Sequence, residues 1–152
     1  MFAGFYNDNL LLVHPDLPFD FFNANQTDTE KLFIKTFPDT EIGVLIENST
    51  VGLFSFAIIK NGQKIRMKDG SDGEYYNDAG DLLPEEKEIL TQKIFEEEEI
   101  DEMKEMEMTD EDIEASRIFQ ASWRVPNLLS KRYLDECVSD IDTDKVKLTK
   151  YN

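Results

Sequence analysis

Three consecutive strand-like segments in the middle of the chain constrain its fold more than any other feature. Residues 42–46 and residues 51–59 are apolar runs whose lengths suit single β-strands. Asn61-Gly62 follows the second run, and this pair accepts the positive φ angles that a type I′ hairpin turn requires. Residues 63–68 then alternate polar and apolar side chains, as a strand with one buried face does. The spacing predicts a three-stranded antiparallel meander.

The segments before the meander predict a hairpin and a compact helix. Residues 2–6 and 10–14 are apolar runs separated by an Asn-Asp-Asn turn, which predicts either a hairpin or one kinked strand. Residues 17–22 indicate a tight turn followed by one turn of helix. Residues 27–30 read Thr-Asp-Thr-Glu, a capping box that satisfies free amides at a helix start. Pro38 is expected to end that helix, because the residue before a proline is pushed out of the helical conformation.

The segments after the meander predict further helices. Pro84 is expected to begin a helix that runs to about Phe95. A second capping-box pattern at residues 109–112 starts the next helix, and Pro126 is expected to interrupt it. Apolar side chains between residues 128 and 138 then indicate one more helix.

Turn-rich and alternating segments complete the pattern. Residues 69–73 and 77–81 are rich in Asp, Asn and Gly and are expected to be loops. Residues 145–151 alternate lysine with apolar side chains, which suits an edge strand guarded against further pairing. We therefore expect an α+β fold with a mainly antiparallel sheet of about five strands and three or four packed helices. Residues 1–152 are expected to form a single globular domain.

The expected core is aromatic and comes from the first third of the chain. Nine of the eleven phenylalanines lie within residues 2–56. The candidate core residues are Phe2, Phe5, Phe33, Phe37, Phe54 and Phe56.

A concentrated negative charge is the second outstanding feature of the chain. Residues 85–114 hold fifteen of the thirty-three acidic residues against three lysines, in a chain whose net charge is −17. Blocks of like charge repel one another and stay solvated, so the acidic segment is expected on the outside. On a helical wheel the apolar stripe breaks at Glu96, which predicts an exposed acidic excursion near residues 96–108, either helical or mobile.

The charge also limits the partners. Nucleic acids and anionic membrane surfaces are bound by clustered lysine and arginine, and this chain has only a modest basic surplus at its C-terminus. A partner selected by charge is expected to be basic. Methionines at positions 103, 106 and 108 are interleaved with the acids, as an adaptable contact surface or as ordinary helix packing residues.

The sequence contains few signs of catalysis or of a cofactor. Asp69, Asp72 and Glu74 do not have the spacing of an EF-hand, and we interpret them as turn residues rather than a calcium site. His14 follows an apolar run, and Cys137 lies on the apolar side of an expected helix, so both are assigned structural roles. No nucleotide-binding or nucleophile motif occurs, so no cofactor, metal or catalytic residue is predicted.

Compartment signals point to the cytoplasm. The N-terminus lacks the basic region of a secretory signal, and no apolar run approaches the ~18 residues that a membrane span needs. One cysteine rules out an intramolecular disulfide.

A stretch of about thirty residues resembles a known group of domains. An aromatic strand leads into a Gly-x-x-x-Arg hairpin at residues 62–66, followed by Asp72-Gly73. A step resembling Gly-x-x-Leu-Pro-x-Glu then runs from Gly80 to Glu86. These motifs resemble those of a family of uncharacterised bacterial domains of unknown function. The resemblance implies an α+β bacterial domain and no assigned activity.

Two functional hypotheses follow. The first is a non-enzymatic protein-interaction module, in a concrete version an immunity- or antitoxin-like protein that neutralises a basic partner. Its candidate contact residues are the acids of the excursion: Glu96, Glu97, Glu98, Glu99, Asp101, Glu102, Glu105 and Glu107. The alternative is a small enzyme or ligand-binding domain with a pocket near Arg66, Tyr75, Tyr76 and Trp123.

Overall fold

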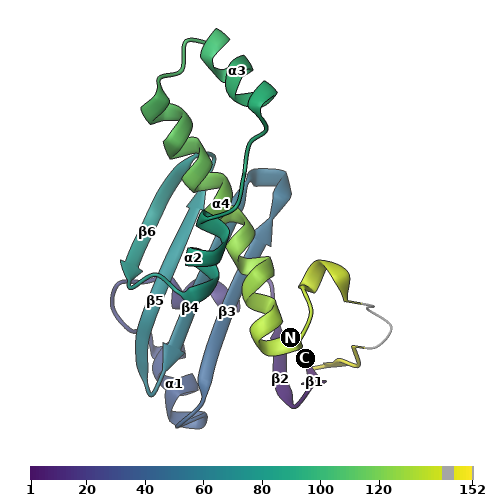
Figure 1. Ribbon diagram of the computed structural model, residues 1–152. Helices are drawn as coiled ribbons and strands as arrows, with labels where there is room; N and C mark the ends of the chain where they lie inside the picture. The colour runs from purple at the N-terminus through teal and green to yellow at the C-terminus, as the bar shows by residue number, and fades with distance from the viewer. Residues whose placement is uncertain (142–145, 152) are drawn as a thin grey trace.

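The computed structural model describes residues 1–141 and 146–151, and it places them in two antiparallel sheets with helices on both faces of the larger one (Figure 1). The larger sheet has the strand order β3-β4-β5-β6 and the smaller sheet the order β2-β1-β7. The strands are β1 (Phe2–Tyr6), β2 (Asn9–Val13), β3 (Glu41–Asn48), β4 (Leu53–Lys60), β5 (Gln63–Ser71), β6 (Glu74–Gly80) and β7 (Thr149–Lys150). The helices are α1 (Asp28–Thr36), α2 (Pro84–Leu90), α3 (Glu97–Glu105) and α4 (Asp110–Leu134), with short 3₁₀ turns η1 (Leu17–Phe21), η2 (Ser49–Val51) and η3 (Val138–Asp140).

The predicted meander is confirmed, and it is longer than expected. Strands β3, β4 and β5 pair antiparallel in chain order, and the β4–β5 turn has positive φ at Asn61 and Gly62. Most of the expected loops at residues 69–73 and 77–81 is strand, and of those residues only Asp72, Gly73 and Asp81 lie outside β5 and β6. β5 continues to Ser71, and a two-residue Asp72-Gly73 turn with positive φ at both residues leads into β6. Asp, Asn and Gly residues therefore lie inside the β5–β6 strand pair. Cross-strand pairing outweighs their weak preference for strands there.

The prediction of one sheet with about five strands was also wrong, although the α+β class is confirmed. The N-terminal hairpin β1–β2 forms, but it pairs with β7 near the C-terminus instead of extending the meander. The terminal amine donates to the Tyr151 carbonyl, and the Tyr151 amide donates to the Met1 carbonyl. The edge strand expected near the C-terminus is present at Thr149–Lys150, while Lys145 of that prediction lies outside the described residues.

Both predicted capping boxes mark helix starts, but they do so differently. The Thr109 hydroxyl accepts from the Asp112 amide, and the Asp112 carboxylate accepts from the Thr109 amide. Thr27 accepts from the Glu30 amide in the same way, but the Glu30 carboxylate is buried and lies 2.9 Å from Lys64 Nζ. The second half of this capping box is therefore replaced by an ion pair to β5.

Two helix boundaries differ from the prediction. α2 ends at Leu90 rather than near Phe95, and α4 runs through Pro126 without interruption. A proline inside a helix removes one backbone donor and crowds the preceding turn. Here Pro126 is buried, and its neighbours Val125 and Leu129 belong to the main core, so packing of this face outweighs the local cost.

The core lies on both faces of the larger sheet. On one face Phe54, Phe56 and Ile58 of β4 pack against helices α2 and α4. On the other face Ala57, Ile59, Val44 and Met67 pack against Phe21 and the residues that surround it in η1 and α1. The alternation of β4 side chains between two buried faces explains why this strand is apolar without a break.

Four of the six expected core phenylalanines are buried or half-buried, and two are not. Phe54 and Phe56 are fully buried, and Phe33 and Phe37 are half-buried. Phe2 and Phe5 are exposed, at 42% and 73% of their surface. They lie on β1 in the smaller sheet, away from the central packing, because the N-terminal hairpin does not join the meander.

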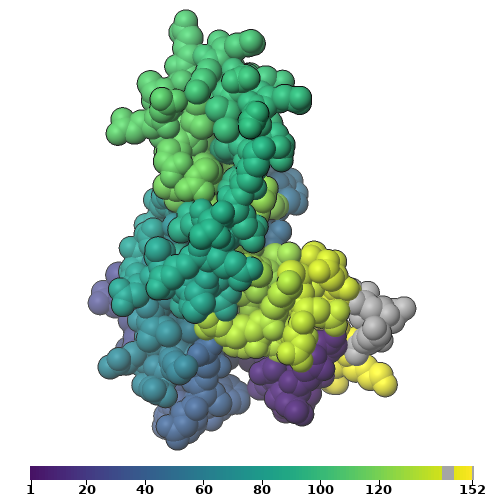
Figure 2. Space-filling view, viewed as in Figure 1, coloured from purple at the N-terminus to yellow at the C-terminus, as the bar shows by residue number. Residues whose placement is uncertain are grey.

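The acidic segment stands out from this body. α3 and the first turns of α4 extend beyond the end of the larger sheet (Figure 1), and Figure 2 shows them as a separate lobe above the body. No side chain of α3 belongs to either core cluster. We call residues 96–108 the acidic arm.

Candidate functional site

The acidic arm brings all eight predicted contact residues to the surface. Each of the eight acids is exposed, and against them the arm carries one lysine, Lys104, which gives it a net charge of −7. These acids are Glu96, Glu97, Glu98, Glu99, Asp101, Glu102, Glu105 and Glu107. A protein surface with this charge density produces a strong local field in the surrounding water.

Local chemistry explains why such an acidic segment is helical. Glu96 caps α3, and its amide donates to the Glu99 carboxylate 2.7 Å away. Glu97, Glu98 and Glu99 occupy the first turn, where the positive end of the helix dipole favours negative charge. Lys104 lies in the last turn, where a cation is favoured. Of the expected excursion, residues 97–105 form a helix in the structure.

Few cations neutralise the negative charge of the acidic arm. Lys93 lies 2.7 Å from Glu96, and Lys104 lies 3.6 Å from Asp110. The hydrogen bond to Glu96, with the attraction of Glu97 and Glu99, raises the pKa of the Lys93 ammonium. Among the described residues no ion pair forms with the other seven acids of the arm. Their field is therefore directed into solvent.

The arm also presents an apolar contact. Met106 is 74% exposed, while Met103 and Met108 are half-buried. A flexible thioether among carboxylates could contact the apolar side of a basic partner.

The four residues named for the second predicted site do not line one pocket together. Arg66 is buried at 1% exposure, and its guanidinium donates to both carboxylate oxygens of Glu86, at 2.7 and 2.6 Å. It also donates to Asp78 Oδ1 at 2.6 Å and contacts the Phe56 ring. Burial lowers the pKa of Arg66, but the hydrogen bonds and charges of Glu86 and Asp78 outweigh it and raise the pKa overall. Arg66 therefore acts as a buried structural centre that ties α2 to the sheet.

Of the three aromatic residues proposed with Arg66, Tyr75 lies beside Lys68 and Ser122, and Tyr76 and Trp123 lie elsewhere. Tyr75 packs its ring on Phe54 and Phe119, at 6.2 and 5.4 Å between ring centroids. Tyr76, the next residue on β6, is 59% exposed and lies on the opposite face of the strand. Trp123 lies along α4 and lines a different hollow that also contains Cys137.

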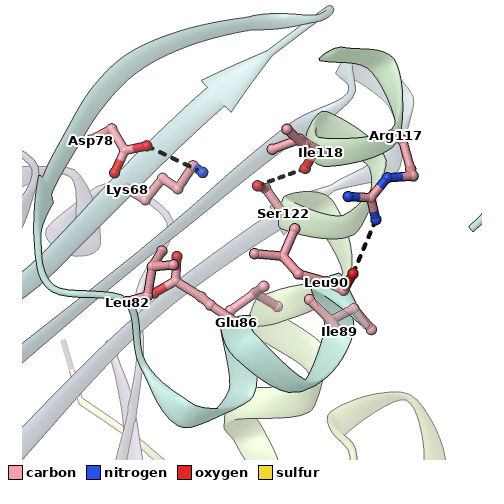
Figure 3. Close-up of a pocket in the computed structure, with 10 residues that line it drawn as sticks. Lys68, Asp78, Leu82, Glu86, Ile89, Leu90, Arg117, Ile118 and Ser122 are labelled. Carbon is pink, nitrogen blue, oxygen red and sulfur yellow. Dashed lines mark hydrogen bonds and ion pairs between the residues drawn. The ribbon is translucent and has the colours of Figure 1, made fainter. Parts of the chain in front are cut away.

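A cavity does exist between β5, β6 and the helices, but different residues line it (Figure 3). Its volume is about 330 Å³. Its lining combines five aliphatic and five polar side chains: Leu82, Ile89, Leu90, Ile118, Val125, Lys68, Asp78, Glu86, Arg117 and Ser122. Lys68 projects into it from β5 and lies 3.2 Å from Asp78.

Sequence reasoning missed Lys68 and Asp78 although a signal was present. Arg66 and Lys68 are two residues apart on β5 and so lie on one face of the strand. The alternation of residues 63–68 predicted a strand with one buried face, which would be the face of the apolar Ile65 and Met67, with the polar residues in solvent. In the structure α2 and α4 cover that side, and Asp78 of β6 lies directly across from Lys68.

The remaining candidates have structural surroundings. His14 Nδ1 accepts hydrogen bonds from the amides of Asp16 and Leu17, which fixes the turn before η1. Cys137 is half-buried just beyond α4 rather than on its apolar face, because the helix ends at Leu134. Within residues 1–141 and 146–151, no three or more His, Cys, Asp or Glu side chains are grouped as a metal site would require.

Comparison of the chain with protein-family models, with curated proteins and with solved structures found no match. The resemblance of the segment from Phe56 to Glu86 to a bacterial domain family stays a prediction. Among the described helices none is long and apolar enough to cross a membrane.

Proposed function

We propose that this protein is a non-enzymatic interaction module that binds a basic protein partner through its acidic arm. In the concrete version of this proposal it acts as an immunity- or antitoxin-like inhibitor, whose arm covers a cationic surface of the partner. Complementary fields accelerate such encounters and suppress association with acidic proteins.

The observation that supports the proposal is the separation of the acidic arm from the packed body. Each of the eight acids is exposed, and none of the α3 side chains contributes to the core. Neither core cluster therefore depends on the charge of this segment. A short capped helix also holds its carboxylates in a fixed arrangement, which lowers the ordering cost of binding.

The body supports the proposal by its rigidity. α4 continues from the arm to the far end of the larger sheet and packs on β3 and β4. Arg132 near its C-terminal end donates to Glu85 and Glu41, which joins α4 to both α2 and β3. The arm is therefore joined to the body at both ends, through residues 91–95, whose Ile94 is buried in the main core, and through the long helix α4 with its several anchors.

A capture experiment tests the proposal. The immobilised chain is incubated with cell extract at about 0.1 M and about 1 M NaCl, where the Debye length falls from ~10 to ~3 Å. Mass spectrometry is expected to identify a basic protein that is retained at low salt and released at high salt. Charge reversal of Glu96 to Glu99 is expected to abolish its retention. Recovery of no basic protein, or of one that is retained equally after charge reversal, would contradict the proposal.

A further inference from the structure

We propose that the cavity between the larger sheet and helices α2 and α4 binds a small carboxylic acid with an aliphatic body, and that Lys68 holds its carboxylate. This site is separate from the acidic arm and does not depend on the function proposed for it. Three observations carry the inference: the size of the cavity, the unused donors at its polar end and its aliphatic wall.

The cavity has the dimensions of a small ligand site. Its volume of about 330 Å³ lies at the lower end of the range of roughly 300–1,000 Å³ found for small-molecule pockets. Five of the ten side chains that line it are aliphatic, and they come from α2, α4 and the loop before α2. Such pockets take an apolar body and orient it with a few polar groups.

Lys68 supplies unused donors at the polar end. Its side chain is only 6% exposed, and its ammonium lies 4.3 Å from the centre of the Tyr75 ring. An ammonium carries three N–H donors, and among the described residues Asp78 Oδ2 is the acceptor in reach, at 3.2 Å. Its remaining N–H groups have no oxygen or nitrogen acceptor among the described residues and are left for a ligand. Figure 3 shows this amine pointing from β5 toward α4, across the cavity.

The carboxylates near Lys68 are already engaged. Asp78 accepts from Arg66 through Oδ1 and pairs with Lys68 through Oδ2. Glu86 accepts from Arg66 through both oxygens and from the Leu83 amide. The two cations and two anions of this cluster balance, so an entering anion meets no net negative charge. A cationic ligand would find no free carboxylate.

The opposite wall also has donors in excess. Arg117 uses three of its five N–H groups, two toward Glu114 and one toward the Leu90 carbonyl. The Ser122 hydroxyl uses its one proton on the Ile118 carbonyl and lies 3.3 Å from the Tyr75 hydroxyl, so it has no spare donor. Lys68 at one end and Arg117 at the other therefore have N–H groups without an acceptor among the described residues, and a carboxylate supplies two acceptor oxygens. The aliphatic wall between them suits a hydrocarbon body.

Octanoate is a suitable probe of this inference. Titration of the ¹⁵N-labelled full chain with octanoate, followed by NMR, is expected to give saturable shifts confined to amides around the cavity. Octanol has the same hydrocarbon body without the charge, and it is expected to bind at least tenfold more weakly. Octylamine is expected to give no shifts around the cavity. Absence of saturable octanoate shifts at millimolar concentration, or equal binding of octanol, would overturn the proposal.

Variants separate the role of Lys68 from general apolar binding. Lys68→Met keeps the hydrocarbon stem and leaves Asp78 paired with Arg66, and it is expected to abolish the tenfold preference for octanoate over octanol. Lys87→Met removes an exposed lysine of α2 that does not line the cavity, and it should bind octanoate as the parent chain does.

A second variant serves if Lys68→Met does not fold. Leu82 lines the cavity and is 42% exposed, so Leu82→Trp can fill the opening without disturbing the core. It is expected to weaken octanoate binding at least tenfold with an unchanged melting temperature. Unchanged affinity in both variants would overturn the assignment. Neutralising the acids of the arm is expected to leave octanoate binding intact, so the failure of one proposal does not imply the failure of the other.

Discussion

At the residue scale, stability depends on a few buried charges whose partners come from distant parts of the chain. Glu86 is 3% exposed and accepts two charge-assisted hydrogen bonds from Arg66 and one from the Leu83 amide. A buried ion pair need not be better than an apolar pair, but removing one member leaves a charge without its partner. The same carboxylate also caps α2, so its loss affects both the sheet and the helix.

Glu86→Ala is therefore expected to be strongly destabilising. Breaking a buried pair of this kind costs about 3–5 kcal/mol. Urea unfolding followed by circular dichroism measures the loss of unfolding free energy. Glu88→Ala, an exposed position on the same helix, is the control and should change stability by less than about 0.5 kcal/mol. A loss below about 1 kcal/mol for Glu86→Ala would show that Arg66 finds other partners.

Asp69 is the opposite case, a buried carboxylate that is poorly satisfied. Its Oδ1 atom has no hydrogen-bond partner, and burial raises its pKa despite hydrogen bonds from Asn77. The folded state thus binds a proton more readily than the unfolded state. Stability must fall as the pH rises through the window between the unfolded and the folded pKa, and the loss is complete above it.

Asp69→Asn is expected to stabilise the protein at neutral pH. Removing a buried charge with incomplete hydrogen bonding is expected to raise the free energy of unfolding by about 1 kcal/mol. The part of the pH dependence that comes from Asp69 should also disappear. Urea unfolding of both proteins across the acidic range measures these effects. Equal destabilisation of the variant at every pH would contradict this reading of Asp69.

At the scale of elements, the fit between α4 and β3 depends on a glycine. Tyr133 of α4 lies over Gly43 of β3, and a Cβ added at Gly43 would lie 2.5 Å from the Tyr133 ring. The Tyr133 hydroxyl donates to Glu41, and Arg132 donates to the same carboxylate. Burial raises the pKa of Glu41, but these hydrogen bonds outweigh it and lower the pKa overall.

Gly43→Ala is expected to destabilise the fold by about 1–3 kcal/mol, the usual cost of overpacking. The ring would have to leave its place or the helix would have to shift. The matched control is the same substitution in a Tyr133→Ala background, where the added methyl group has space. The penalty there should fall below about 0.5 kcal/mol. If Gly43→Ala costs the same unfolding free energy with and without the Tyr133 ring, the cost arises within strand β3 and not from the contact with α4.

At the scale of elements, part of the fold and part of the candidate site could be predicted from the sequence. The meander and both helix starts were predictable, because period-two alternation, Asn-Gly and Thr-x-x-acid patterns act over a few residues. β6 and the continuation of α4 through Pro126 were not, because long-range packing overrides local preference there. The exposed acids were found from charge alone. The Lys68 cavity was missed, because its polar wall becomes visible only once α2 and α4 cover β5.

At the scale of the whole molecule, the body provides the folding stability and the acidic arm provides the charged surface. The two core clusters hold the body together, and α3 contributes nothing to either of them. Like charges in the arm repel one another, and salt screens that repulsion. The arm should therefore be dispensable for folding.

Replacing the whole acidic arm, residues 96–108, with a Gly-Ser segment of equal length tests this division. The free energy of unfolding is expected to change by less than about 1 kcal/mol, since no core contact is lost. Added salt should stabilise the parent chain more than the replaced chain. Loss of cooperative thermal unfolding in the replaced chain would mean that the arm supports the body.

We expect the position of the acids, and not only the total charge, to recruit a basic partner. Two variants with equal net charge separate these effects. One changes Glu96, Glu97, Glu98 and Glu99 to glutamine, and the other neutralises four exposed acids of the body, Asp16, Glu47, Glu74 and Asp81. Each changes the net charge of −17 by four charges. The measurement is the amount of basic protein captured from cell extract at about 0.1 M salt. The arm variant is expected to lose at least nine-tenths of the capture while the body variant retains it. Equal loss in both variants would show that total charge alone recruits the partner.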